Sequence, residues 1–166
     1  MTAAGGTVRA DLAFSAGGVE GPAATLRSGL ESRITFTVRC YERRQGLAGL
    51  FGDALLAQHT VDRVAFYDAF EQRFVVEQDG DHTSFADEAG LQDGFFAVHG
   101  MVLAARVAAP RSGAGSAGPS RYVAARAQYD PVRLSPPLTI LTLFGFAARY
   151  TTPWVRRDVP RAEAAP

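Results

Sequence analysis

The chain of 166 residues contains no lysine and no asparagine, and it has a single cysteine. All 17 basic residues are therefore arginine, and 17 acidic residues balance them to a formal net charge of zero. A balanced charge gives no electrostatic attraction toward nucleic acid, so we expect no nucleic-acid partner. We interpret the arginine bias as codon composition, with recognition of phosphate or carboxylate groups by guanidinium as the alternative.

The lone cysteine excludes an internal disulfide bond. Cys40 falls on the apolar face of an expected strand, which predicts a packed and unreactive thiol. No run of 18 apolar residues exists, which excludes a membrane-spanning helix. Residues 1–6 lack the apolar segment of a signal peptide. We therefore expect either a cytosolic protein or a chain whose leader has been removed.

The sequence also lacks the local motifs of common catalytic sites. It has no Gly-x-Ser-x-Gly elbow, no Walker loop, no dinucleotide-binding glycine pattern and no cysteine pair. Asp79, Asp81 and His82 are residue types that bind metals, but turns favour Asp and Gly as well, and we interpret them as a turn. We expect no catalytic residue, no cofactor and no metal. An enzyme built from distant side chains such as His59, His82 and Asp62 is the alternative.

Alternation of apolar and polar residues is the main pattern that is present. In the segment 33–44, Ile34, Phe36, Val38 and Cys40 share one face, which predicts a half-buried strand at the centre of an antiparallel sheet. Further strands are predicted at residues 7–14, 58–68, 73–78, 82–85, 101–109 and 121–129. Helices are predicted at residues 22–30, 85–98 and from 136 to 146, and a flexible loop or linker at 110–119.

These elements predict a mainly β fold: an antiparallel, β-sandwich-like sheet with one or two packed helices. We predict that residues 1–158 form a single antiparallel β-rich domain and that residues 159–166 form a disordered tail. The helix at 85–98 starts with a capping-box pattern at Ser84 to Asp87. Its two glycines, Gly90 and Gly94, lie four residues apart on one face; close packing against the sheet would explain them, with a sparse, weakly stable helix as the alternative.

Three kinds of surface are candidates for binding. The apolar, glycine-rich segment 45–56 is predicted to tuck over a sheet edge, with an exposed binding loop as the alternative. The apolar segment 138–146 is predicted to pack in the core, with a partner-facing or interfacial position as the alternative. Arg and Tyr side chains on the polar strand faces, including Arg39 and Tyr41, either cover a solvated face or bind a partner, and we favour the solvated face. The candidate binding surface comprises Arg39, Tyr41, Leu47, Leu50, Phe51, Leu138, Phe144 and Trp154.

Three stretches of the chain resemble a small bacterial family known only as a domain of unknown function, number four-three-nine-zero. They are LRSGLESRITFTVRCYER at 26–43, VDRVAFYDAFEQRFVV at 61–76 and LSPPLTILTLFGFAARYTTPWV at 134–155. Members of that family usually begin with an export or anchor segment, so the resemblance implies a place in the cell envelope. It implies no activity and no catalytic residues.

The sequence thus predicts a non-catalytic bacterial protein of the cell envelope or periplasm that binds a protein partner or an apolar ligand. Peripheral membrane association is compatible with the apolar segments 45–56 and 138–146. A cytosolic structural or regulatory module, or an enzyme whose site is assembled only in the fold, is the alternative. The oligomeric state is left open.

Overall fold

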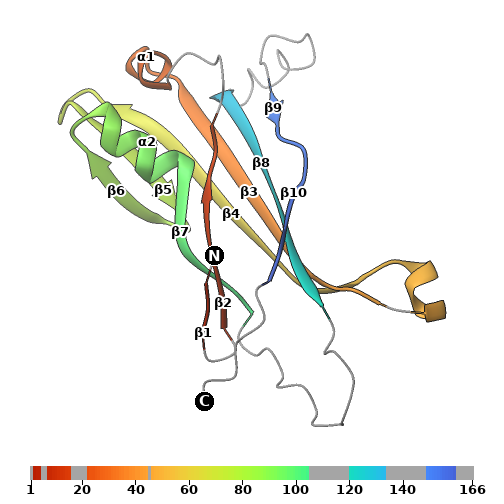
Figure 1. The fold of residues 1–166 in the computed structure, drawn as a ribbon. Helices are drawn as coiled ribbons and strands as arrows, with labels where there is room; N and C mark the ends of the chain where they lie inside the picture. The colour runs from red at the N-terminus through yellow and green to blue at the C-terminus, as the bar shows by residue number, and fades with distance from the viewer. Residues whose placement is uncertain are drawn as a thin grey trace.

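The computed structural model describes residues 2–4, 7–15, 22–44, 46–104, 120–133 and 149–159. Within them, two antiparallel sheets and two α-helices form a sandwich-like arrangement (Figure 1). The predicted fold class, mainly β with packed helices, is confirmed. No helix in the described part of the chain is long and apolar enough to cross a membrane.

The larger sheet has seven strands in the order β10-β8-β3-β4-β5-β6, with β9 paired to β8. Its strands are β3 (Glu31–Glu42), β4 (Ala54–Asp68), β5 (Arg73–Gln78), β6 (Asp81–Phe85), β8 (Arg121–Arg133), β9 (Tyr150–Thr151) and β10 (Val155–Asp158). The smaller sheet has the order β1-β2-β7 and consists of β1 (Thr2–Ala4), β2 (Thr7–Ala13) and β7 (Ala97–Ala104). The helices are α1 (Pro22–Arg27), the 3-10 helix η1 (Gly46–Phe51) and α2 (Glu88–Phe96).

Strand β3 is central, as its sequence pattern predicts. It pairs with β4 on one side and with β8 on the other. Every second side chain from Ser32 to Cys40 is buried, because successive residues of a strand point to opposite faces. Burial raises the pKa of the Cys40 thiol, which fits a packed and unreactive cysteine.

The predicted hairpin at Asp79-Gly80 is confirmed and joins β5 to β6. Both turn residues have positive φ, 54° at Asp79 and 89° at Gly80. Two consecutive positive φ angles give a turn whose twist matches that of the flanking strands. An aspartate followed by a glycine meets this requirement at little steric cost.

Helix α2 begins and ends inside the range that its sequence predicts. Ser84 and Phe85 belong to strand β6, and the N-cap is Asp87, whose carboxylate accepts a 2.7 Å hydrogen bond from the Gly90 N–H. The capping box predicted an N-cap at Ser84, which is wrong, because the N-cap lies three residues later. The helix ends at Phe96, because the chain turns directly into the extended backbone of β7 at Ala97.

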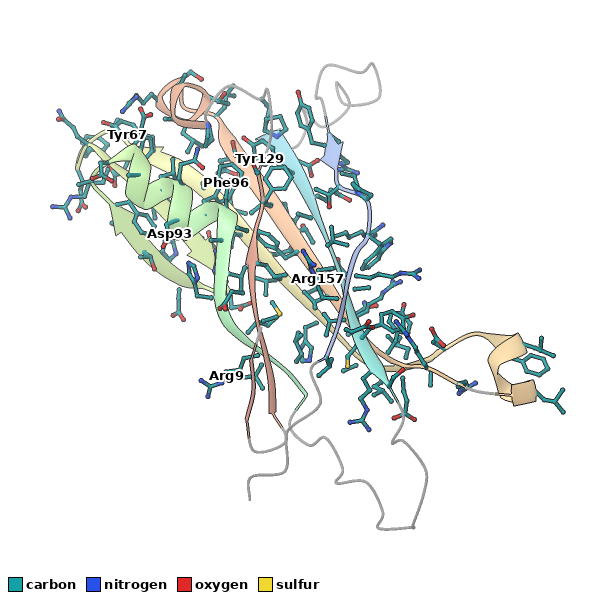
Figure 2. The ribbon with its side chains drawn as sticks, in the orientation of Figure 1. Arg9, Tyr67, Asp93, Phe96, Tyr129 and Arg157 are labelled. Carbon is teal, nitrogen blue, oxygen red and sulfur yellow. The ribbon has the colours of Figure 1, made fainter. Side chains whose placement is uncertain are left out.

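The core lies between the larger sheet on one side and α1, α2, β2 and β7 on the other. Its main cluster is aromatic: the Phe95 and Phe96 rings are 4.8 Å apart, and Phe96 meets Tyr129 edge-on at 5.2 Å. Figure 2 shows Phe96 and Tyr129 side by side in this space. A smaller cluster joins Ala10 and Leu103 to Val38, Cys40 and Val123, and so holds the two sheets together.

Several predicted elements fall outside the described residues. They are the loop at 110–119, the apolar segment 136–146 and residues 105–109 of the strand predicted at 101–109. The described part of that strand is β7, which begins four residues earlier than predicted, at Ala97. The predicted tail starts at Val159, whose N–H donates a 2.9 Å hydrogen bond to the Arg121 carbonyl. Residues 160–166 lie outside the described part.

Candidate functional site

The β3–β4 hairpin extends past the other strands as an arm that ends in η1 (Figure 1). Three apolar side chains at its end, the hairpin tip, are 83% (Leu47), 80% (Leu50) and 87% (Phe51) exposed. The prediction that this segment tucks over a sheet edge is wrong. The chain instead closes in a 3-10 turn flanked by Gly46 and Gly52, both at positive φ, and carries its apolar side chains outward.

The base of the arm is rich in arginine. Arg43 forms a 2.7 Å ion pair with Asp158, and Arg44 follows it in the chain. The backbone N–H of Arg44 donates a 3.3 Å hydrogen bond to Asp53 across the arm. Among the described residues from 46 to 52 no side chain is charged. The arm thus presents an apolar end above a base where arginine and carboxylate side chains alternate.

A pocket of about 340 Å³ lies on the outer face of the larger sheet, the face turned away from the core. We call it the outer-face pocket. It is lined by Arg39, Tyr41, Asp53, Tyr122, Ala124, Trp154 and Arg156. The volume suits a small organic molecule, since ligand pockets start at about 300 Å³.

Strand pairing assembles this pocket from three parts of the chain. Arg39 and Tyr41 on β3 stand opposite Ala124 and Tyr122 on β8. On the other side of β8, Ala124 pairs with Arg156 of β10. Directly opposite residues point to the same face of a sheet, so the pairing brings these side chains to one place.

Aromatic rings form much of the pocket wall. Tyr41 and Tyr122 stack with ring centroids 5.1 Å apart and planes 16° from parallel. The Tyr122 hydroxyl donates a 2.9 Å hydrogen bond to Asp53, which fixes the ring. Burial and that hydrogen bond raise the pKa of Tyr122, so the hydroxyl stays protonated and keeps donating to Asp53.

Guanidinium groups lie against these rings. The Arg39 and Arg126 guanidinium carbons are 4.8 and 4.9 Å from the centre of the Trp154 ring. Arg156 lies 5.6 Å from the Tyr122 ring. Arg39 also donates a 2.8 Å hydrogen bond from Nε to Gln58. Within the described residues, neither Arg39 nor Arg156 is in an ion pair with a carboxylate.

The predicted binding residues therefore separate into two places. Arg39, Tyr41 and Trp154 meet in the outer-face pocket, and the three apolar residues of the 45–56 segment form the hairpin tip. Leu138 and Phe144 lie outside the described residues. Sequence reasoning missed the pocket residues Asp53, Tyr122, Ala124 and Arg156. The only sequence signals were the arginine pair after Trp154 and the position of Tyr122 at the start of a predicted strand.

The Arg and Tyr side chains predicted on the solvated strand faces are Arg39, Tyr41, Arg63, Tyr67, Arg121 and Tyr129. The prediction is wrong for three of these six, which lie on the core side. Tyr129 is buried in the core, and Tyr67 packs against Phe74 at 5.2 Å. Arg63 points to the core side, where it hydrogen-bonds the carbonyls of Gly94, at 2.7 Å, and Ala97. It thereby satisfies backbone acceptors at the end of α2 that the helix itself leaves unpaired.

The residues of the alternative enzyme hypothesis do not converge. His59 lies 3.1 Å from the Leu103 carbonyl, on the core side of β4. Asp62 faces the other side, where it accepts hydrogen bonds from Arg33 and Thr35. His82 is on β6 against Phe66. In the described ranges no three His, Cys, Asp or Glu side chains gather as metal ligands would.

Asp62 gives a prediction for stability in acid. Its burial favours the neutral form, but the hydrogen bonds from Thr35 and Arg33 outweigh that effect and lower its pKa below 3.8. A carboxylate with a lowered pKa in the folded state stabilises the fold above its ordinary pKa and loses this contribution as the pH falls further. The Arg33 and Asp62 side chains are 40% and 44% exposed, so the contribution is about 1 kcal/mol or less.

We expect Asp62→Asn to unfold at lower urea concentration than the parent protein at neutral pH. The difference in the free energy of unfolding should begin to shrink at about pH 4, the ordinary pKa range of an aspartate, and should be lost only once the pH has fallen through the lowered pKa of the folded state. Urea titrations of both proteins at a series of pH values measure this difference in the free energy of unfolding. Asp81→Asn, at an exposed turn position, is the control, and a difference that grows in acid would contradict the assignment.

Comparison of the chain with protein-family models, with curated proteins and with solved structures found no match.

Proposed function

We propose that this chain is a non-catalytic binding protein of the bacterial cell envelope that attaches to a lipid surface through its hairpin tip. The observation that carries the proposal is the exposure of Leu47, Leu50 and Phe51 at the end of the β3–β4 arm. Contiguous exposed apolar groups usually mark a site of interaction, because leaving them in water is unfavourable.

Insertion of the tip into a lipid surface removes three apolar side chains from water and so favours attachment. Burial of one large apolar side chain stabilises a complex by about 1.5–3 kcal/mol. Three such side chains give about 4.5–9 kcal/mol, and the loss of translational and rotational freedom on binding offsets a large part of this gain. The exposed Arg44 at the base of the arm adds attraction to lipid phosphate groups.

A lipid surface fits this tip better than a protein does. A stable protein interface takes about 20–30 residues from each partner, whereas η1 has six residues. A projecting arm can reach only a groove shaped to receive it, but a membrane accepts apolar side chains without a matching shape. The placement in the bacterial envelope rests on the family resemblance alone, and a cytosolic structural or regulatory module is the alternative.

Vesicle co-sedimentation tests the proposal. We expect the parent protein to co-sediment with vesicles containing phosphatidylglycerol and, more weakly, with neutral phosphatidylcholine vesicles. Replacing all three tip residues by serine should weaken binding at least tenfold, because the apolar contribution is removed. The tip is exposed, so melting temperatures of the two proteins should agree closely.

Phe70→Ser is the matched control, since Phe70 is fully exposed in the β4–β5 connection, outside the arm. Its vesicle binding should equal that of the parent protein. Equal binding by the parent and the tip variant would contradict the proposal. Loss of crosslinking to a protein partner, with vesicle binding unchanged, would replace the lipid by a protein.

A further inference from the structure

The outer-face pocket is a second binding site, separate from the hairpin tip and independent of the proposed function. We infer that it binds a small aromatic carboxylate, with the carboxylate between Arg39 and Arg156 and the ring against Tyr41, Tyr122 and Trp154. The inference rests on the available donors, the aromatic walls and the charge of the lining residues.

The donors are available because the nearby acids are occupied. Asp53 accepts a hydrogen bond from the Tyr122 hydroxyl, and Asp158 pairs with Arg43. Glu42 pairs with Arg121 at 3.0 Å. Among the described residues, Arg156 has its ring contact with Tyr122, and Arg39 uses Nε on Gln58 while its terminal nitrogens make no ion pair. Guanidinium groups bind carboxylates through paired N–H donors.

The aromatic residues that line the pocket favour a ligand with a flat apolar ring. Tyr41 and Tyr122 are stacked on each other, and Trp154 stands against the guanidinium of Arg39. Aromatic rings that line a cavity stack on, or meet edge-on, a ring of the ligand. Arg39 and Arg126 already lie against Trp154, and Tyr41 lies against Tyr122, so a ligand ring would meet the edges of these rings, a contact that a purely aliphatic anion does not make.

The charge of the lining residues favours an anion, and the Arg126 guanidinium against the Trp154 ring adds to the positive charge beside the pocket. Of the seven lining residues, Arg39 and Arg156 carry one positive charge each and Asp53 carries one negative charge, which leaves a net charge of +1. A carboxylate neutralises this charge. A phosphate monoester, with a charge near −2 at neutral pH, leaves an excess negative charge beside Asp53.

Trp154 makes the inference directly measurable, because it is the only tryptophan of the chain and it lines the pocket. Titration of the full chain with phenylacetate should change the tryptophan emission saturably. Acetate, which lacks the ring, and 2-phenylethanol, which lacks the charge, should each bind at least tenfold more weakly. Phenyl phosphate should also bind more weakly than phenylacetate.

Arg156→Gln should weaken phenylacetate binding at least tenfold, because the exposed arginine is lost from the pocket while the fold is kept. Arg157→Gln is the matched control: Arg157 is the next residue on β10, does not line the pocket, and should leave binding unchanged (Figure 2). Melting curves verify that both variants are folded.

Three results would overturn the inference: no saturable change with phenylacetate, equal binding of phenylacetate and 2-phenylethanol, or equal loss in the Arg156 and Arg157 variants. Tighter binding of phenyl phosphate would overturn the assignment to a carboxylate. None of these results depends on vesicle binding, so the pocket and the hairpin tip are tested separately.

Discussion

Phe95→Ala is expected to lower the free energy of unfolding by about 3–5 kcal/mol, the range for truncating a buried phenylalanine. Phe95 is fully buried on α2, with its ring 4.8 Å from that of Phe96 and 6.2 Å from that of Tyr129. Truncation removes the apolar contacts of the ring and leaves a cavity that the surrounding aromatic side chains cannot fill. For a chain of this length the expected fall in melting temperature is about 6–20 °C.

Urea unfolding followed by circular dichroism measures this effect. Phe70→Ala makes the same chemical change at a fully exposed position and should alter the free energy of unfolding by about 0.5 kcal/mol or less. A Phe95 variant as stable as the Phe70 variant would contradict the packing of α2 against the larger sheet.

Gly94→Ala is expected to destabilise the protein by about 1–3 kcal/mol through overpacking. A Cβ atom at Gly94 would lie 2.1 Å from the tip of the Phe85 ring, which is closer than any real contact. Phe85 belongs to β6, so the glycine lets α2 lie directly on this strand. The close packing predicted at Gly90 and Gly94 is therefore packing of these glycines against the Phe85 side chain.

A double-mutant cycle isolates this contact. In a Phe85→Ala background the obstructing ring is absent, and Gly94→Ala should become neutral or stabilising by up to about 1 kcal/mol, since alanine is the better helix former. The sign of the change should therefore reverse. A destabilisation of equal size in both backgrounds would show that a different neighbour, or the backbone itself, requires the glycine.

The two candidate sites share one end of the larger sheet. Asp53 follows the hairpin tip directly and also holds Tyr122 in the outer-face pocket. The stacked pair of Tyr41 and Tyr122 stands where the β3–β4 arm leaves the sheet. Asp53 thus belongs to the pocket by its side chain and to the arm by its position in the chain.

The sequence by itself determined where most of the strands lie and which face of β3 is buried. The alternation from Ser32 to Cys40 predicts both the strand and its core side, because side chains of a strand alternate between two faces. The turn at Asp79-Gly80 could also be predicted from the sequence, because its positive φ angles restrict the residue types that fit there. Local chemistry specifies such features within a few residues.

The tertiary structure alone decided where the side chains of the candidate sites meet. Tyr122 and Arg156 lie near Arg39 because β8 lies between β3 and β10 in the larger sheet. No local sequence pattern predicts the order of the strands. Exposure of the hairpin tip has the same origin. An apolar loop is buried or exposed according to whether another element reaches it, and the arm projects beyond the strands that could cover Leu47 and Phe51.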